Sequence, residues 1–223
     1  MGIISLEKQD HLFWLGRYCE RVYTTIRTFL LGYDRMLDDE NSGYKAICQM
    51  LDIPDIYKDE EDFIKTYVYS SKDVNSIYSN LRRAYDNAIV LRDEISSISL
   101  SYIQMALDDM EEYSNKPFSL LQLQLIIDLL LAFWGSVDVY VLSDNSRDLI
   151  KCGRSLERLD LYIRLGYPKE RLAREFHMFE TRMGRISPLQ YNFEAYNTFS
   201  TAIRNKADLK QQLNTLNKIF VRR

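Results

Sequence analysis

Two short segments of the chain place glycine, arginine and glutamate in the same order and spacing. Residues 16–21 read GRYCER and residues 153–158 read GRSLER. A carboxylate beside arginines can accept charge-assisted, bidentate hydrogen bonds, and the same guanidinium groups can bind a phosphate or a foreign carboxylate. The pattern therefore predicts either an internal ion-pair network or a site for an acidic group.

Both segments belong to a longer internal repeat. Residues 12–28 recur at 149–165, an offset of 137, with seven of seventeen positions identical. At about 100° per residue, the charged residues of each copy share one helix face and the apolar residues share the opposite face. The charged residues are Arg17, Glu20, Arg21 and Arg27 in the first copy, and Arg154, Glu157, Arg158 and Arg164 in the second.

The charged faces have two interpretations. As a solvated stripe, each Glu pairs with the Arg three residues before it, which contributes about 0.2–0.5 kcal/mol. However, Leu161 and Leu165 lie on the charged face of the second copy, which favours packing against another helix. We expect the two faces to meet across a pseudo-twofold axis, with Asp128 and Asp138 as further counter-charges.

The glycine that opens each motif lies inside a predicted helix, where Gly costs about 1 kcal/mol relative to Ala. Close approach of another backbone, or room for a ligand, would account for Gly16 and Gly153.

Composition indicates a helix-rich protein, which we expect to form one domain over residues 1–223. The chain is 46% hydrophobic and 27% charged, with eight Gly and four Pro. A net charge of −3 points to neither nucleic acid nor an anionic membrane as a partner. Three cysteines without a CxxC pair, and two histidines without neighbouring ligands, predict neither a disulfide framework nor a metal site, and no cofactor is expected. Because the first residues lack a signal-peptide pattern, we expect a cytoplasmic location.

Helical periodicity without strand patterns predicts an all-α fold, a multi-helix up-and-down bundle. Expected helices cover residues 6–37, 46–51, 73–112 as two helices or one kinked near 96–101, 119–142, 145–166, 169–185, 189–205 and 207–220. The acidic run 59–62 is expected to be the N-terminus of a further helix. The apolar segment 119–142 is expected to be a buried bundle helix, because an Asp at the centre of a membrane span costs about 2.5–3.5 kcal/mol.

Nucleophilic catalysis has little support in the sequence. Neither a Ser/His/Asp or Cys/His arrangement nor a phosphate-binding glycine loop is recognisable. His177 is flanked by Phe176 and Met178 and is expected to be packed or hydrogen-bonded. An enzyme that uses Glu20 and Glu157 as acid and base stays open, because paired buried carboxylates can differ in pKa.

With its two GRxxER copies, the chain resembles the alpha-E family of bacterial all-helical proteins, named for a Glu-Arg motif. The resemblance extends to Asp86, Asn87, Ala88, Arg92 and Ile95, whereas Tyr85 and Ile89 stand where the family usually has Arg. It implies an association with ATP-grasp ligase-like and transglutaminase-like proteins in peptide synthesis or modification.

Three hypotheses follow. The first is a non-catalytic helical partner or scaffold subunit for such proteins. The second is an enzyme or a receptor for a small anion or acidic group, with its site at the paired Arg/Glu faces. The third is a homodimer whose charged faces meet between subunits.

Overall fold

The computed structural model describes residues 4–38, 43–186, 191–205 and 208–220. These residues form ten α-helices and one 3-10 helix and contain no β-strand, which confirms the all-α fold. The helices are α1 (Leu6–Asp38), α2 (Gly43–Leu51), α3 (Glu60–Tyr69), α4 (Ile77–Val90), α5 (Arg92–Tyr113), α6 (Leu120–Tyr140), α7 (Asp144–Arg164), α8 (Lys169–Met183), α9 (Phe193–Arg204) and α10 (Leu213–Asn217), with the 3-10 helix η2 (Leu209–Gln212) between the last two.

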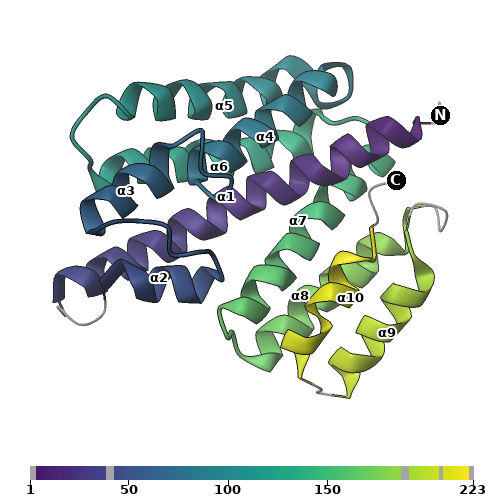
Figure 1. The fold of residues 1–223 in the computed structure, drawn as a ribbon. Coiled ribbons are helices and arrows are strands. Elements are labelled where there is room, and N and C mark those ends of the chain that lie inside the picture. Colours follow the sequence, from purple (N-terminus) through teal and green to yellow (C-terminus); the bar gives the residue numbers. More distant parts are fainter. Residues whose placement is uncertain (1–3, 39–42, 187–190, 206–207, 221–223) are drawn as a thin grey trace.

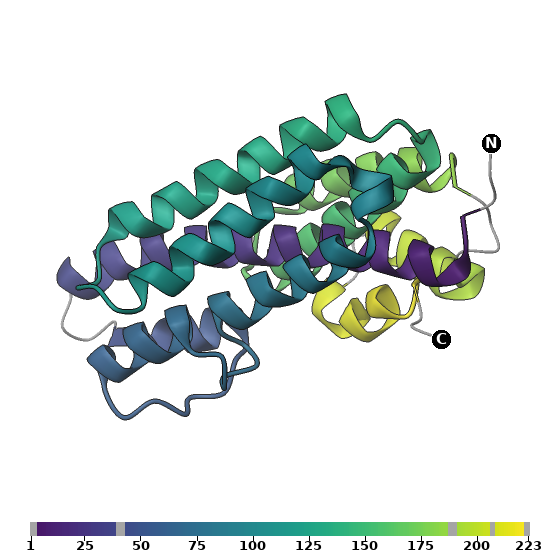
Figure 2. The ribbon, with the colours of Figure 1, turned by 90° about the horizontal axis from the view of Figure 1, so that it is seen from above.

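The 33-residue α1 is the central element of the bundle. It packs against α4, α6 and α7. Helices α4, α5 and α6 lie on one side of α1, and α7 to α10 lie on the other side (Figures 1 and 2). Leu15, Cys19, Val22 and Ile26 on its apolar face are all fully buried.

Side-chain caps begin several helices where the sequence predicted them. Ser119 and Gln122 form a reciprocal capping box at the start of α6, and Ser143 accepts a hydrogen bond from the Ser146 amide in α7. Asp59 caps α3 in the same way, so the acidic run 59–62 is a helix N-terminus. The segment 73–112 combines both expected forms: α4 ends at Val90, and α5 is kinked at Ser96, whose φ is 69°.

The predicted single helix over 207–220 is wrong. Residues 206 and 207 lie outside the described residues, and the segment that follows forms the short helices η2 and α10. Asp208 accepts a hydrogen bond from the Lys210 amide, and Phe220 stacks on Phe13 of α1 with ring centroids 4.1 Å apart. The α-helical path is interrupted at Gln212, whose φ and ψ are −96° and 0°.

Helix α6 is apolar over most of its length and has an inner and an outer face. Leu123, Ile126 and Leu130 are fully buried in the bundle. By length and composition, residues 120–140 would be able to cross a membrane, although 44% of their most apolar window is buried inside the protein.

Candidate functional site

Helices α1 and α7 cross in very close contact at the glycines of the repeat. A Cβ on Gly16 would lie 1.9 Å from the Ile150 carbonyl oxygen, and a Cβ on Gly153 would lie 2.0 Å from the Phe13 carbonyl oxygen. The contacts are reciprocal, because Phe13 and Ile150 are themselves 137 residues apart. Both glycines therefore allow the two backbones to approach closely, and they do not make room for a ligand.

This crossing brings the charged faces of the two repeats together. On one side, the Glu20 carboxylate accepts hydrogen bonds from Arg158 Nε and Nη2 at 2.8 and 2.9 Å, and from Arg154 Nε at 3.0 Å. Thr24 Oγ1 donates a fourth at 3.0 Å. Glu20 is fully buried, so its charge is compensated entirely by groups of the protein.

The other side repeats the arrangement with the helices exchanged. The Glu157 carboxylate accepts hydrogen bonds from Arg17 Nε at 2.6 Å and from Arg21 Nε at 2.5 Å. Glu157 is 1% exposed, and Arg17 is 4% exposed. Among the described residues neither glutamate pairs with an arginine of its own helix, so the expected pairs three residues apart give way to pairs between helices.

The electrostatics of the network favour the ionised forms of Glu157 and Arg158. Burial alone would raise the pKa of the Glu157 carboxyl, but the charges and hydrogen bonds of Arg17 and Arg21 lower it to about 2. Burial alone would lower the pKa of the Arg158 guanidinium, but Glu20 raises it. A carboxylate with a pKa near 2 is a poor general base at neutral pH.

Several further residues, which the sequence analysis did not assign, extend the network. Asp160 accepts hydrogen bonds from Arg164 Nε at 2.6 Å and from Asn217 Nδ2 at 2.6 Å, and Asn217 accepts one from Arg17 at 2.9 Å. Asn217 belongs to α10, so the C-terminal helix closes one end of the network. The i,i+4 spacing of Asp160 and Arg164 could have indicated their pair, whereas Asn217 carries no local signal.

At the other end, α6 and α8 contribute. The Arg154 guanidinium lies 4.1 Å from the centre of the Trp134 ring, a cation–π contact. Arg158 Nη1 donates to Glu175 of α8 at 3.4 Å. Neither partner was predicted, because each is positioned by a helix distant in sequence.

Three predicted residues lie outside the network, and the roles expected for them are corrected. Arg27 is exposed and contacts the Tyr23 hydroxyl at 3.4 Å. Asp128 is exposed and accepts a hydrogen bond from Gln124, and Asp138 pairs with Lys151 at the surface. Both aspartates lie on the outer face of α6, where water hydrates the carboxylates and no buried counter-charge is needed.

A cavity of about 430 Å³ lies beside the Glu157 side of the network. The charged residues that line it are Arg17, Arg21, Arg164, Glu157, Asp160 and Asp52. Three cations face three carboxylates, and ion pairs connect them, including Arg164 with Asp52. The cavity therefore offers no surplus positive charge to an anion.

A bundle with a reciprocal Arg/Glu network at a close helix crossing defines an all-helical protein built around a duplicated motif. The chain matches the model of the Alpha-E family, described as a predicted alpha-helical domain with a conserved ER motif, over residues 8–217. It belongs to that family. The curated proteins and the solved structures compared with it give no match.

Proposed function

We propose that this protein is a non-catalytic helical subunit that works by binding other proteins. Its expected partners are ATP-grasp ligase-like and transglutaminase-like proteins of a peptide-synthesis or peptide-modification system. The observation that carries the proposal is the state of the motif carboxylates: Glu20 and Glu157 are at most 1% exposed, and each is held by two arginines of the opposite helix. These groups lock the fold and are not available to a substrate.

The cysteine thiols support the same view. Burial is the main cause that raises the pKa of Cys19 and Cys152, and it raises that of Cys48 to about 11. A thiol that stays protonated at neutral pH and lies in the core is a weak nucleophile.

The outer face of α6 supports a partner-binding role. Leu121, Leu125 and Val139 are 66%, 41% and 66% exposed along it, and Leu142, just beyond the end of α6, is 88% exposed. A Cβ added to Gly135, on the same helix, would meet nothing within 4 Å. Exposed apolar side chains that share a face with scattered charges, here Asp128 and Asp138, are found at protein-interaction surfaces.

The test is an affinity pull-down with the full chain, followed by identification of bound proteins by mass spectrometry. We expect the wild type to recover an ATP-grasp or transglutaminase-like protein and a Leu125→Asp/Val139→Asp variant to lose it. Leu31→Asp is the matched control, because Leu31 is 59% exposed on a helix elsewhere. Hydrolysis or ligation of peptides by the purified protein alone would refute the proposal.

The two other hypotheses have less support. A receptor for an acidic group at the Arg/Glu faces would need uncompensated cations, and the cavity beside them has balanced charges. Ligand-induced stabilisation that Arg154→Ala abolishes would favour that receptor. A dimer joined through the charged faces is not required, because those faces meet within one chain. Sedimentation as a dimer at micromolar concentration would revive it.

A further inference from the structure

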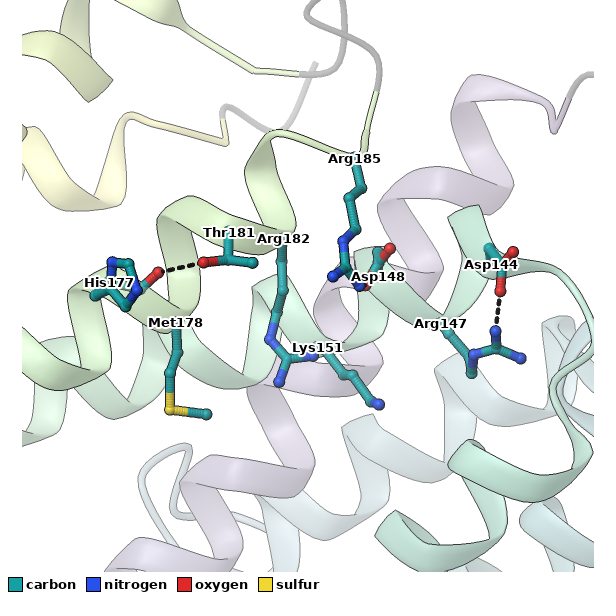
Figure 3. Close-up of a pocket in the computed structure, with 9 residues that line it drawn as sticks. All are labelled: Asp144, Arg147, Asp148, Lys151, His177, Met178, Thr181, Arg182 and Arg185. Carbon is teal, nitrogen blue, oxygen red and sulfur yellow. Dashed lines mark hydrogen bonds and ion pairs between the residues drawn. The ribbon is translucent and has the colours of Figure 1, made fainter.

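A second, larger pocket lies between α7 and α8 and shares no residue with the Arg/Glu network. Its volume is about 830 Å³, within the range of small-molecule sites. It is lined by Asp144, Arg147, Asp148, Lys151, His177, Met178, Thr181, Arg182 and Arg185, shown in Figure 3. His177, expected to be packed or hydrogen-bonded, is an exposed residue of this lining.

The charge of this pocket is opposite to that of the whole protein. Four permanently cationic side chains face two carboxylates, although the chain carries a net charge of −3. Arg147 pairs with Asp144, and Arg185 lies 4.0 Å from Asp148. Lys151 pairs with Asp138 at the edge of the pocket, where the Asp138 side chain is 57% exposed. In each pair one member is well exposed to solvent. Ion pairs that water reaches are worth at most about 1 kcal/mol, so another anion can replace the carboxylate.

Arg182 is the cation of this pocket that lacks a carboxylate partner among the described residues. Its Nε is buried without a hydrogen-bond acceptor. A buried donor left unsatisfied costs about 1–3 kcal/mol, and no carboxylate of the described residues offsets this cost, so the charge of the Arg182 guanidinium is available to an anion that enters the pocket. Figure 3 shows Arg182 of α8 and Lys151 of α7 extending toward the same side of the pocket.

We propose that this pocket binds a small solute through its phosphate groups. Cations reach the pocket from α7, from α8 and from Arg185 just beyond the end of α8. The oxygens of a tetrahedral phosphate are not confined to one plane, as those of a carboxylate are, so they suit cations that converge from these three places. The described lining residues include no Phe, Tyr or Trp, so a stacked base is not part of the recognition. The site goes beyond the proposed partner-binding role and does not depend on it.

Calorimetric titration of the full-length protein with pyrophosphate tests the proposal, with ionic strength held constant by KCl. We expect saturable binding by the wild type, and at least tenfold weaker binding by Arg182→Gln and by Lys151→Gln. Arg185→Gln should also weaken binding, and its side chain is 64% exposed, so its loss leaves the fold intact. Arg92→Gln is the matched control, because Arg92 is 73% exposed on α5 and contacts Asp93 at 3.9 Å.

Each contrary result overturns the proposal. Pyrophosphate that shows no saturable binding to the wild type removes the site. Equal affinity for citrate removes the preference for phosphate. Binding that is lost in Arg21→Gln but kept in Arg182→Gln moves the site to the cavity beside the Arg/Glu network. Equal weakening by Arg92→Gln reduces the effect to general surface charge.

Discussion

Substitution of Gly16 by Ala gives the sharpest test of the helix crossing, because the structure reverses the usual sign of the effect. Inside a helix, Gly→Ala normally stabilises by about 1 kcal/mol. At Gly16 the new Cβ would lie 1.9 Å from a backbone oxygen of α7, and a backbone atom cannot rotate away as a flexible side chain can. An ordinary contact needs at least 3.4 Å, so the helices must separate by more than 1 Å.

The energetic consequence follows from what that separation disturbs. Overpacking a tight contact costs about 1–3 kcal/mol. The Arg17–Glu157 and Arg154–Glu20 hydrogen bonds, at 2.6 and 3.0 Å, lengthen at the same time, and bonds to charged groups contribute about 1.5–3 kcal/mol each. After subtraction of the propensity gain, we expect a net loss of at least about 3 kcal/mol. For a protein of this size that lowers Tm by about 6–12 °C.

Gly135 provides the matched control for the assay. It also lies inside a helix, and a Cβ there meets no atom within 4 Å. Thermal and urea unfolding, followed by circular dichroism, should show Gly135→Ala slightly more stable than the wild type and Gly16→Ala clearly less stable. If Gly16→Ala is as stable as Gly135→Ala, the close crossing of α1 and α7 is wrong, and the network argued from it is wrong as well.

Three further predictions concern charged residues. Glu157→Gln should lower the free energy of unfolding at pH 7 by about 3 kcal/mol or more, because it leaves two arginines without their buried counter-charge; urea unfolding within 1 kcal/mol of the wild type would contradict this. Because the pKa of Glu157 falls from 4.5 to about 2 on folding, its ionisation contributes about 3 kcal/mol that is present above pH 5 and lost as the pH falls toward 2. Glu157→Gln should therefore show a shallower loss of stability over that range, and an unchanged pH profile would refute the assignment. Arg27→Ala and Asp128→Asn should each change stability by less than about 0.5 kcal/mol, since both side chains are exposed; a Tm shift of several degrees would restore them to the network.

Local signals in the sequence were enough for most of the helices. Ser119 with Gln122, Ser143, and the acidic run after Lys58 mark helix starts through hydrogen bonds within a few residues, and the structure places the starts there. The C-terminal segment was different. Residues 209–217 form two short helices with an irregular backbone at Gln212, and Phe220 just beyond them stacks on Phe13, a contact between the two ends of the described chain that local patterns do not reveal.

The sequence predicted most of the residues that make up the candidate site, but not which of them pair with one another. The repeat identified Arg17, Glu20, Arg154 and Glu157, since shared spacing is visible in one sequence. Asp128 and Asp138 were predicted as counter-charges because they interrupt the apolar segment 119–142, although both lie on the face of α6 that water reaches. The additional carboxylate of the network is instead Asp160, which pairs with Arg164 four residues later on the same helix.

By itself, the sequence determined the helices, the duplicated motif and the membership of the charged faces, because each depends on interactions or spacings within a few turns of one helix. The tertiary structure decided which glutamate meets which arginine, since those partners are more than 130 residues apart and only the crossing of α1 and α7 brings them within 3 Å. It also decided that Arg182 lines a cationic pocket with its Nε buried and without a hydrogen-bond acceptor. The sequence does not single out Arg182, because the pocket is formed by residues of two helices and neither helix encodes it alone.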